Sequence, residues 1–218
     1  MTGRIYLVRH AEATHNVTHN FDLHDPPLSS PLGIFQAENL GKEFPYHERI
    51  AAIVSSPLRR TIQTTLLAFS QSLDKRYSDE ETWGVFEGAE LILSPDVQES
   101  SALPCDTGSD KSILVTEFPN LDFSTLLPNW NLKEGRYEAE NSAVQSRAAA
   151  VRKFLYHKLD ERESADDRRK DIVVVTHGVF MKHLSGDTTI DLPKAGWKSF
   201  RLVKSAGGDD FIFEEDSG

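Results

Sequence analysis

Short apolar runs that end abruptly in polar, chemically versatile residues constrain the fold of this chain more than any other feature. Ile5–Val8 is followed at once by Arg9 and His10. Ile172–Val175 ends in the same way, with Thr176 between it and His177. Apolar runs of this length, rich in β-branched residues, predict buried strands. Ligands bind at the carboxyl ends of the strands in open α/β sheets, so we expect these polar groups to gather at one edge of a sheet.

Helical patterns alternate with the strand-like runs along the chain. The strand-like runs fall at residues 5–8, 51–55, 90–93 and 172–175, with two short β-like segments near 200–203 and 211–213. The helical patterns fall at residues 31–44, 57–69, 144–159 and 180–184. In the first of these helices we expect Ser30 to be the cap and Ile34 to lie on the buried face. Strands that alternate with helices predict an α/β fold.

Three stretches break this alternation. Residues 74–88 are polar and are expected to be irregular, and the charge-dense run 160–170 is expected to be a solvated helix end and loop. Residues from about 104 to 141 carry proline, glycine, asparagine and scattered aromatic residues, which is typical of a loop. A loop of this length is unusual inside a compact domain unless it covers an active site. We therefore interpret it as a cap or lid inserted in a single domain that spans residues 1–218.

The balance of acidic and basic residues indicates which classes of molecule this protein can bind. Lys and Arg total 24 against 34 for Asp and Glu, which gives a formal net charge of −10. This balance argues against nucleic acid or an anionic membrane as the main partner. A local basic pocket can still bind a small anionic substrate within an acidic surface. The lone cysteine, Cys105, cannot form an internal disulfide, which is typical of a reducing compartment.

The beginning of the sequence bears on localisation. The first residues leave no room for the apolar core of a signal peptide, and no apolar run reaches membrane-spanning length. We therefore expect a cytoplasmic protein. No pattern in the sequence indicates an oligomeric state.

Polar side chains that suit the chemistry of a phosphate group follow four of the predicted segments. These groups are Arg9 with His10, Arg60, Glu99 and His177. A neutral imidazole can attack phosphorus, because the ordinary pKa of histidine lies near ~6.5. Arginines bind phosphoryl oxygens through planar forks and keep their charge, and a carboxyl group can protonate the departing oxygen. Together these side chains are the parts that phosphoryl transfer requires.

Three segments also resemble motifs of one known family and occur in that family's order. Leu7–Glu12 resembles the Arg-His-Gly signature of the histidine phosphatase superfamily, in its phosphoglycerate-mutase-like branch (branch 1). Ser56–Thr64 resembles the Ser-Pro-x-x-Arg-Ala-x-x-Thr segment of that branch, and Thr176–Gly178 resembles its second histidine motif. The matches extend from Arg4 to about Gly186. The resemblance implies a three-layer α/β/α sandwich with a mostly parallel central sheet.

Carried over to this chain, the resemblance implies that His10 is the nucleophile and forms a phosphohistidine intermediate. Arg9, Arg60 and His177 would line the phosphate pocket, and Asn16 would complete it. Arg60 is the matching arginine because it holds the fifth place of the Ser-Pro-x-x-Arg segment.

The resemblance also implies a general acid. Glu99 matches the acidic position of the family's Leu-x-Glu segment, and it would protonate the leaving group and later activate water. Glu87, Glu90 and Asp106 lie nearby in the sequence as other candidates. A histidine phosphatase needs no metal and no cofactor, so we expect neither. The expected partner is a small phosphorylated substrate.

The sequence departs from the family pattern at a few positions. Ala11 replaces the usual glycine, and Ala13 stands where a mutase-type enzyme often has a hydroxyl residue. Pro104–Gly108 resembles the corresponding segment of fungal members and is not the mutase sequence at this position. We therefore favour a phosphomonoester hydrolase. A phosphoglycerate-mutase-type phosphoryl transfer and a catalytically silent phospho-ligand-binding module are the alternatives.

Three further histidines, His15, His19 and His24, are closely spaced. A metal site is conceivable at this spacing, but no acidic or cysteine cluster accompanies them. Zinc sites usually need three or four convergent ligands. We therefore interpret these residues as loop histidines around the mouth of the pocket.

Overall fold

A six-stranded sheet forms the middle layer of the computed structural model, which describes residues 3–78, 83–163, 168–208 and 210–216. The strands are β1 (Ile5–Arg9), β2 (Ile50–Ser55), β3 (Glu90–Leu93), β4 (Asp171–Thr176), β5 (Trp197–Lys204) and β6 (Phe211–Glu215). Their order in the sheet is β3-β2-β4-β1-β5-β6. The first four strands in this order are parallel, and β5 and β6 add an antiparallel edge. The prediction of an α/β fold with a mostly parallel central sheet is confirmed.

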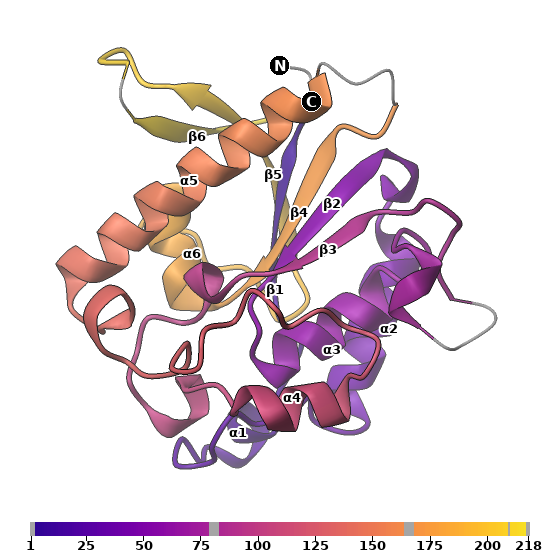
Figure 1. The fold of residues 1–218 in the computed structure, drawn as a ribbon, viewed down its shortest axis with the longest axis vertical. Coiled ribbons are helices and arrows are strands. Elements are labelled where there is room, and N and C mark those ends of the chain that lie inside the picture. The colour runs from indigo at the N-terminus through magenta and orange to yellow at the C-terminus, as the bar shows by residue number, and fades with distance from the viewer. Residues whose placement is uncertain (1–2, 79–82, 164–167, 209, 217–218) are drawn as a thin grey trace.

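Helices cover both faces of this sheet, which gives three layers (Figure 1). The α-helices are α1 (Thr14–Thr18), α2 (Leu32–Glu43), α3 (Arg59–Ala68), α4 (Lys111–Glu117), α5 (Asn141–Glu163) and α6 (Gly178–Ser185). Helices α2 and α3 lie on one face, and α5 and α6 on the other. Tyr6 and Val8 of β1 pack on the α2–α3 side, whereas Ile5 and Leu7 pack on the α5–α6 side. A strand buried on both faces explains why the apolar run is continuous.

The register between β1 and β4 determines where the residues that follow these two strands lie. Val8 lies opposite Val175, and Arg9 lies opposite Thr176. Because the two strands are parallel and end at the same level, the residues that follow them emerge side by side. The carboxyl ends of the central strands therefore meet at one edge of the sheet.

The segment from about 104 to 141 is ordered and packed. It contains α4 and two turns of 3-10 helix, Pro104–Asp106 and Gly135–Tyr137. Its apolar side chains, among them Phe123 and Trp130, join the core cluster on the α2–α3 face. At Gly108, an added Cβ would lie 2.1 Å from the indole ring of Trp130, so only glycine fits there. The prediction of a loop is thus wrong for this stretch, and its role as a cap stays a prediction.

Two helices begin later than predicted. Helix α2 begins at Leu32, and Ser30 does not cap it. The hydroxyl oxygen of Ser29 instead accepts the N–H of Gly33 at 3.2 Å. Helix α3 begins at Arg59 rather than at residue 57, because the backbone is still extended at the preceding residue.

The buried stripe of α2 also differs from the predicted one. Ile34 was expected on the buried face, but it is 38% exposed. The stripe runs instead through Gly33, Ala37, Leu40 and Gly41. Small residues dominate this stripe because α2 approaches α3 closely: an added Cβ at Gly41 would lie 2.6 Å from the carbonyl oxygen of Ala68.

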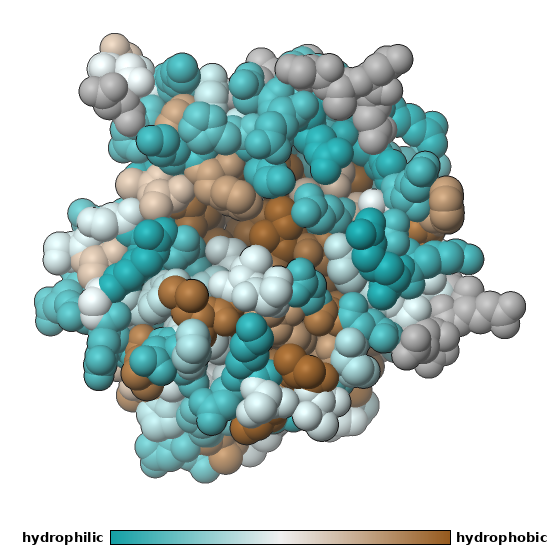
Figure 2. All heavy atoms as spheres, viewed as in Figure 1, coloured by the Kyte–Doolittle hydropathy of each residue, from teal (hydrophilic) through white to brown (hydrophobic). Residues whose placement is uncertain are grey.

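Parts of the two other stretches predicted to be irregular, residues 79–82 and 164–167, lie outside the described residues. Beside them, Lys75–Tyr77 forms a turn of 3-10 helix and α5 continues to Glu163. Among the described helices, none combines the length and apolar character needed to cross a bilayer. On the face shown in Figure 2, hydrophilic side chains cover most of the surface and hydrophobic ones form small patches between them.

Candidate active site

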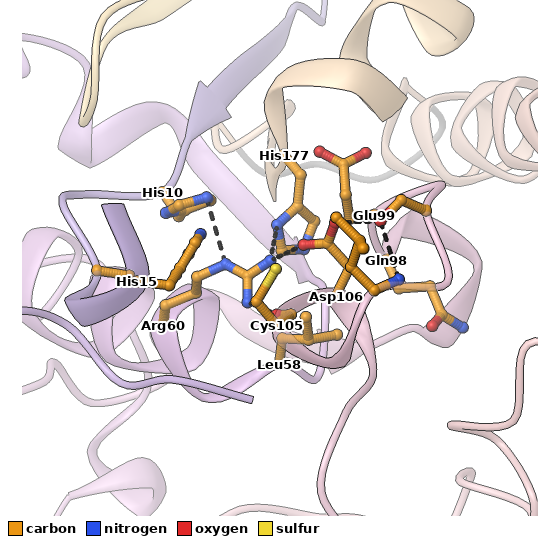
Figure 3. A network of polar contacts seen from close by, with 12 residues as sticks. His10, His15, Leu58, Arg60, Gln98, Glu99, Cys105, Asp106 and His177 are labelled. Carbon is orange, nitrogen blue, oxygen red and sulfur yellow. Dashed lines mark hydrogen bonds and ion pairs between the residues drawn. The ribbon is translucent and has the colours of Figure 1, made fainter. Parts of the chain in front are cut away.

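Two buried imidazoles lie side by side where β1 and β4 end (Figure 3). The backbone N–H of His10 donates to the carbonyl oxygen of Thr176 at 3.0 Å. The ring centroids of His10 and His177 lie 5.2 Å apart. His10 is 4% exposed, and His177 is fully buried. The structure therefore brings together the two histidines that the sequence motifs identify.

The hydrogen bonds of His10 define which ring nitrogen carries the proton. Nδ1 lies 2.7 Å from the carbonyl oxygen of Ala11, which can only accept, so Nδ1 carries the proton. Nε2 accepts a hydrogen bond from Nε of Arg60 at 3.3 Å. Burial, followed by the charge of Arg60, lowers the pKa of His10 well below its ordinary value. The ring is therefore neutral at physiological pH, and the lone pair of Nε2 accepts from Arg60.

His177 has the opposite tautomer. Its Nδ1 lies 3.1 Å from Nη2 of Arg60, which can only donate, so Nδ1 accepts. Its Nε2 then donates to the hydroxyl oxygen of Ser56 at 2.9 Å. Burial and the charge of Arg60 lower the pKa of His177 well below its ordinary value. Both imidazoles thus face one guanidinium as neutral acceptors.

Arg60 is the centre of this network. It stands in the first turn of α3, directly after the short connection from β2, and its side chain is 1% exposed. Besides the two histidines, it donates from Nη1 to the carbonyl oxygen of Cys105 at 2.6 Å. Its Nη2 also forms an ion pair with Asp106 at 2.9 Å. A buried guanidinium needs such partners, because an unpaired buried charge is costly.

Arg9 reaches the site from the end of β1. Its Nη1 donates to the carbonyl oxygen of Leu192 at 2.6 Å and to the carboxylate of Asp191 at 3.1 Å. An added Cβ at Gly178 would lie 3.2 Å from the guanidinium carbon of Arg9. The glycine that follows His177 therefore makes room for Arg9.

Asn16 lies at the edge of the site on helix α1. Its side-chain oxygen accepts the N–H of Ala13 at 3.2 Å, and its side-chain nitrogen lies 2.9 Å from Nε2 of His15. His15 is buried, and its ring centroid lies 6.5 Å from that of His10. Burial, followed by Arg60, lowers the pKa of His15 to about 4.

The carboxylate of Glu99 is held at the start of α6. Oε1 accepts the N–H groups of Phe180 and Ser100, each at 2.8 Å, and Oε2 accepts the N–H of Val179 at 3.1 Å. Negative charge is stabilised at a helix N-terminus by the helix dipole. Beneath it, Nζ of Lys133 donates to the backbone carbonyl oxygen of Glu99 at 2.9 Å.

The three other acidic candidates differ in position. Glu90, on β3, lies near Lys158 and Arg162, away from the histidines. Glu87 lies outside the lining of the site. Asp106 does lie in the site, but its Oδ1 pairs with Arg60 and its Oδ2 accepts a hydrogen bond from Ser101 at 2.6 Å.

A cavity of about 230 Å³ opens over these groups. Its lining contains five of the six predicted site residues, which are Arg9, His10, Asn16, Arg60 and Glu99. His177 lies behind the lining and contacts it through Arg60. The remaining lining residues include Phe21, Leu103, Asp106, Val179, Lys182 and Lys194.

The sequence interpretation placed His15 near this lining but missed Lys194. His15 was expected in a loop at the pocket mouth, but it lies in α1 and is buried, whereas His19 and His24 are exposed. Lys194 belongs to no sequence motif, and only the register of the folded chain brings it to the site. In the described part of the chain, no group of three or more His, Cys, Asp or Glu side chains is arranged to hold a metal ion.

The sequence matches proteins of one family. The model of the family described as histidine phosphatase superfamily (branch 1) matches residues 5–95. A protein described as phosphoglycerate mutase-like protein 1, from Arabidopsis thaliana, is 29% identical over 205 residues. That alignment covers 82% of this chain and 69% of the Arabidopsis protein.

Solved structures share the fold over the whole chain. A mycobacterial glucosyl-3-phosphoglycerate phosphatase in complex with VO3 aligns with a TM-score of 0.60 at 18% identity, and the alignment covers 100% of this chain and 99% of that one. A variant of phosphoserine phosphatase from Entamoeba histolytica in complex with phosphoserine aligns with a TM-score of 0.55 at 18% identity, covering 99% and 97% of the two chains. At these identities the likeness shows a common fold.

Proposed function

We propose that this chain belongs to branch 1 of the histidine phosphatase superfamily, whose model it matches over residues 5–95, and that it hydrolyses small phosphomonoesters through a phosphohistidine at Nε2 of His10. The observation that carries the proposal is the state of that ring. A hydrogen bond to the Ala11 carbonyl fixes the proton on Nδ1, and burial keeps the ring neutral. The unprotonated Nε2 therefore lies at the floor of an open cavity, and it would be released for attack when Arg60 turns its N–H groups to the phosphoryl oxygens.

In the first step, Nε2 of His10 attacks phosphorus and the bond from phosphorus to the ester oxygen breaks. Arg9 and Arg60 would stabilise the charge on the three phosphoryl oxygens, with Asn16 as an additional ligand. His177 would orient Arg60, because its Nδ1 accepts from the guanidinium and its Nε2 donates to Ser56. The leaving oxygen takes a proton from the carboxyl group of an acid. Glu99 faces the same cavity and would fill this role in its protonated form, which it must reach against the backbone N–H groups that stabilise its carboxylate.

In the second step, water attacks the phosphohistidine. Glu99 would accept the proton that water loses, and the bond between Nε2 and phosphorus breaks. Inorganic phosphate and neutral His10 are regenerated, so atoms and charges balance over the cycle. The step uses only side chains of this chain, because a histidine phosphatase works without a metal ion.

The cavity of about 230 Å³ has room for the phosphoryl group and the atoms next to it, and it opens to solvent beyond them. Residues 104–141 would serve as the cap: Cys105 and Asp106 line the cavity, and Lys133 reaches under Glu99. The structural relatives named above act on glucosyl-3-phosphoglycerate and on phosphoserine, so phosphorylated organic acids are the first class to screen. The resemblance of Pro104–Gly108 to fungal members and the cytoplasmic location stay predictions.

A mutase is the second candidate, because the Arabidopsis relative is described as phosphoglycerate mutase-like. A mutase returns the phosphoryl group to the substrate instead of passing it to water. Isomerisation of phosphoglycerate that outpaces phosphate release would therefore favour the mutase, and phosphate release without isomerisation would favour the hydrolase.

The test replaces His10 with Ala and follows both turnover and covalent labelling. We expect hydrolysis of an aryl phosphate to fall by at least ~10⁴-fold, and the acid-labile phosphate label seen on the wild type to disappear. His19→Ala, which changes an exposed histidine, is the matched control and should keep normal turnover and label. Near-normal activity in the His10 variant would overturn the proposal. Phosphate binding without turnover in the wild type would favour a silent binding module.

A further inference from the structure

A tight turn holds Lys194 over the end of β1. The N–H of Gly196 donates to the carbonyl oxygen of Pro193 at 2.9 Å, which leaves Lys194 and Ala195 at the corner of the turn. Ala195 has φ of +58°, in the left-handed region that a residue with a side chain rarely adopts. Such local strain persists only when the surroundings hold it, and it is common at functional sites.

The turn is attached to the nucleophile strand by its backbone. The N–H of Ala195 donates to the carbonyl oxygen of His10 at 3.3 Å, and the N–H of Arg9 donates to the carbonyl oxygen of Gly196 at 3.0 Å. These bonds fix the position of Lys194 relative to Arg9 and His10. Main-chain hydrogen bonds to β1 therefore hold the backbone of Lys194 beside the site.

Lys194 differs from the two arginines of the cavity in how its charge is paired. The guanidinium of Arg9 lies 3.1 Å from the carboxylate of Asp191, and that of Arg60 lies 2.9 Å from the carboxylate of Asp106. Each arginine is thus already paired with a negative charge. Within the described residues, the half-buried ammonium of Lys194 has no hydrogen bond or ion pair.

The electrostatic field of Lys194 reaches the reacting groups. Its charge contributes to the lowered pKa values of His10, His15 and His177. Burial, followed by the charge of Arg9, lowers the pKa of Lys194 itself to about 8. The charged and titratable groups that face it are Arg9, His10, Glu12, His15, Arg60, Glu99, His177, Lys182 and Asp191.

We propose that Lys194 binds the transferred phosphoryl group and supplies net positive charge that the two paired arginines do not. The inference rests on the proposed function, since it needs a phosphoryl group in this cavity. A dianionic phosphoryl group has to be balanced by cations that are not already neutralised. The ammonium of Lys194 meets this condition, and it lies in the lining shared with His10 and Arg60.

The test measures binding of inorganic phosphate by titration calorimetry, which requires no turnover, for the wild type and for Lys194→Met, Lys194→Arg and Lys182→Met. We expect Lys194→Met to weaken phosphate binding by about tenfold or more, because it removes a charged hydrogen-bond donor. Lys194→Arg should stay within about threefold of the wild type. Lys182→Met removes another cavity lysine and should weaken binding less than Lys194→Met does.

The pH dependence gives a readout that a purely structural role would not change. Between about pH 8 and 10 the wild type should lose phosphate affinity as Lys194 deprotonates. Lys194→Arg should bind without this loss, because arginine keeps its charge, and Lys194→Met should bind weakly at every pH in this range.

Three results would overturn the inference. These are unchanged phosphate binding in Lys194→Met, equal weakening in Lys194→Met and Lys182→Met, and a Lys194→Met effect confined to KM for substrates that carry a carboxylate. The last result would place the lysine at the other end of the substrate. A wild type that binds phosphate through Lys194 but hydrolyses nothing would sink the proposed function alone.

Discussion

The floor and the rim of the cavity are built in different ways. The floor is taken here as His10 and Arg60 together with His177 directly behind them. These residues follow strands directly or begin a helix, and they are at most 4% exposed. The rim, taken here as Phe21 and Leu103, lies on connecting segments, and each of these side chains is 48% exposed. The floor side chains are held by hydrogen bonds from several elements, whereas the rim side chains meet solvent.

The difference follows from the cost of burying polar groups. A buried guanidinium or imidazole must find partners, so the floor is a closed network with little freedom. The same network fixes the tautomers and the neutral state of both histidines. The rim has no such requirement, and it is free to vary with the substrate. Chemistry is therefore expected to depend on the floor, and substrate preference on the rim.

Arg60→Lys tests whether the chemistry depends on the fixed geometry of the floor. The substitution keeps one positive charge but cannot contact His10, the Cys105 carbonyl and Asp106 together, because an ammonium lacks the planar fork of a guanidinium. We expect kcat/KM for an aryl phosphate to fall by about 10²–10³-fold, the usual effect of losing one stabilising donor at the reacting group.

Arg59→Lys is the matched control for this variant. Arg59 stands in the same helical turn, but its guanidinium pairs with Glu117 instead of the histidines. The control should change kcat/KM by less than about twofold, because a partly exposed ion pair contributes little. If Arg60→Lys kept more than a tenth of the activity, the fixed geometry of the floor would be dispensable.

The floor could be predicted from the sequence because most of its residues directly follow predicted strands. The runs Ile5–Val8 and Ile172–Val175 are apolar throughout, so they had to be buried strands, and the polar residues after them had to meet at one edge. The motif around Ser56–Thr64 selected Arg60 over its neighbour. These inferences needed only local pattern and the parallel order of the strands.

The roles of Asp106 and Lys194 were harder to predict from the sequence, because their positions depend on contacts between distant segments. Asp106 was one of several nearby acids, and only its ion pair with Arg60 separates it from Glu87 and Glu90. Lys194 had no motif at all, and the turn that carries it is fixed by hydrogen bonds to the backbone at the end of β1.

Local capping and packing also escaped prediction. Ser29, and not Ser30, bonds the first turn of α2, because the chain is still turning at Pro31. Ile34 faces solvent because α2 presents its small residues to α3. A hydrophobic pattern cannot distinguish a stripe of small residues that allows close helix contact from one of large residues that fill space.

His15 lies between the floor and the rim of the cavity. The pKa of its ring therefore reports whether the buried environment of the floor includes this position. Its pKa is lowered from 6.5 to about 4. Below pH 6.5 the unfolded chain binds a proton on this ring that the folded chain does not, so stability is lost as pH falls through this window. From pH 7.5 to pH 5 we expect a loss of about 2 kcal/mol from this residue alone.

The measurement compares urea unfolding of the wild type and of His15→Gln at both pH values. The free energy of unfolding of the wild type, relative to that of the variant, should fall by about 2 kcal/mol from pH 7.5 to pH 5. The reason is that the unfolded variant has no ring at this position to take up the proton. His19→Gln, which changes an exposed ring, should leave the pH dependence of the wild type intact. An unchanged difference for His15→Gln would mean that this ring is solvated and belongs with the rim.

The smallest expected effect tests the rim itself. Leu103 is 48% exposed at the cavity mouth, so Leu103→Ala removes apolar contact with the leaving group but none with the phosphoryl group. We expect KM for a bulky aryl phosphate to rise about threefold, while inhibition by inorganic phosphate stays the same. Leu127→Ala, which changes a leucine 71% exposed outside the cavity lining, should change neither value. If Leu103→Ala weakened inorganic phosphate as much as the aryl ester, the rim would be acting on the floor, and substrate preference could not vary independently of the chemistry.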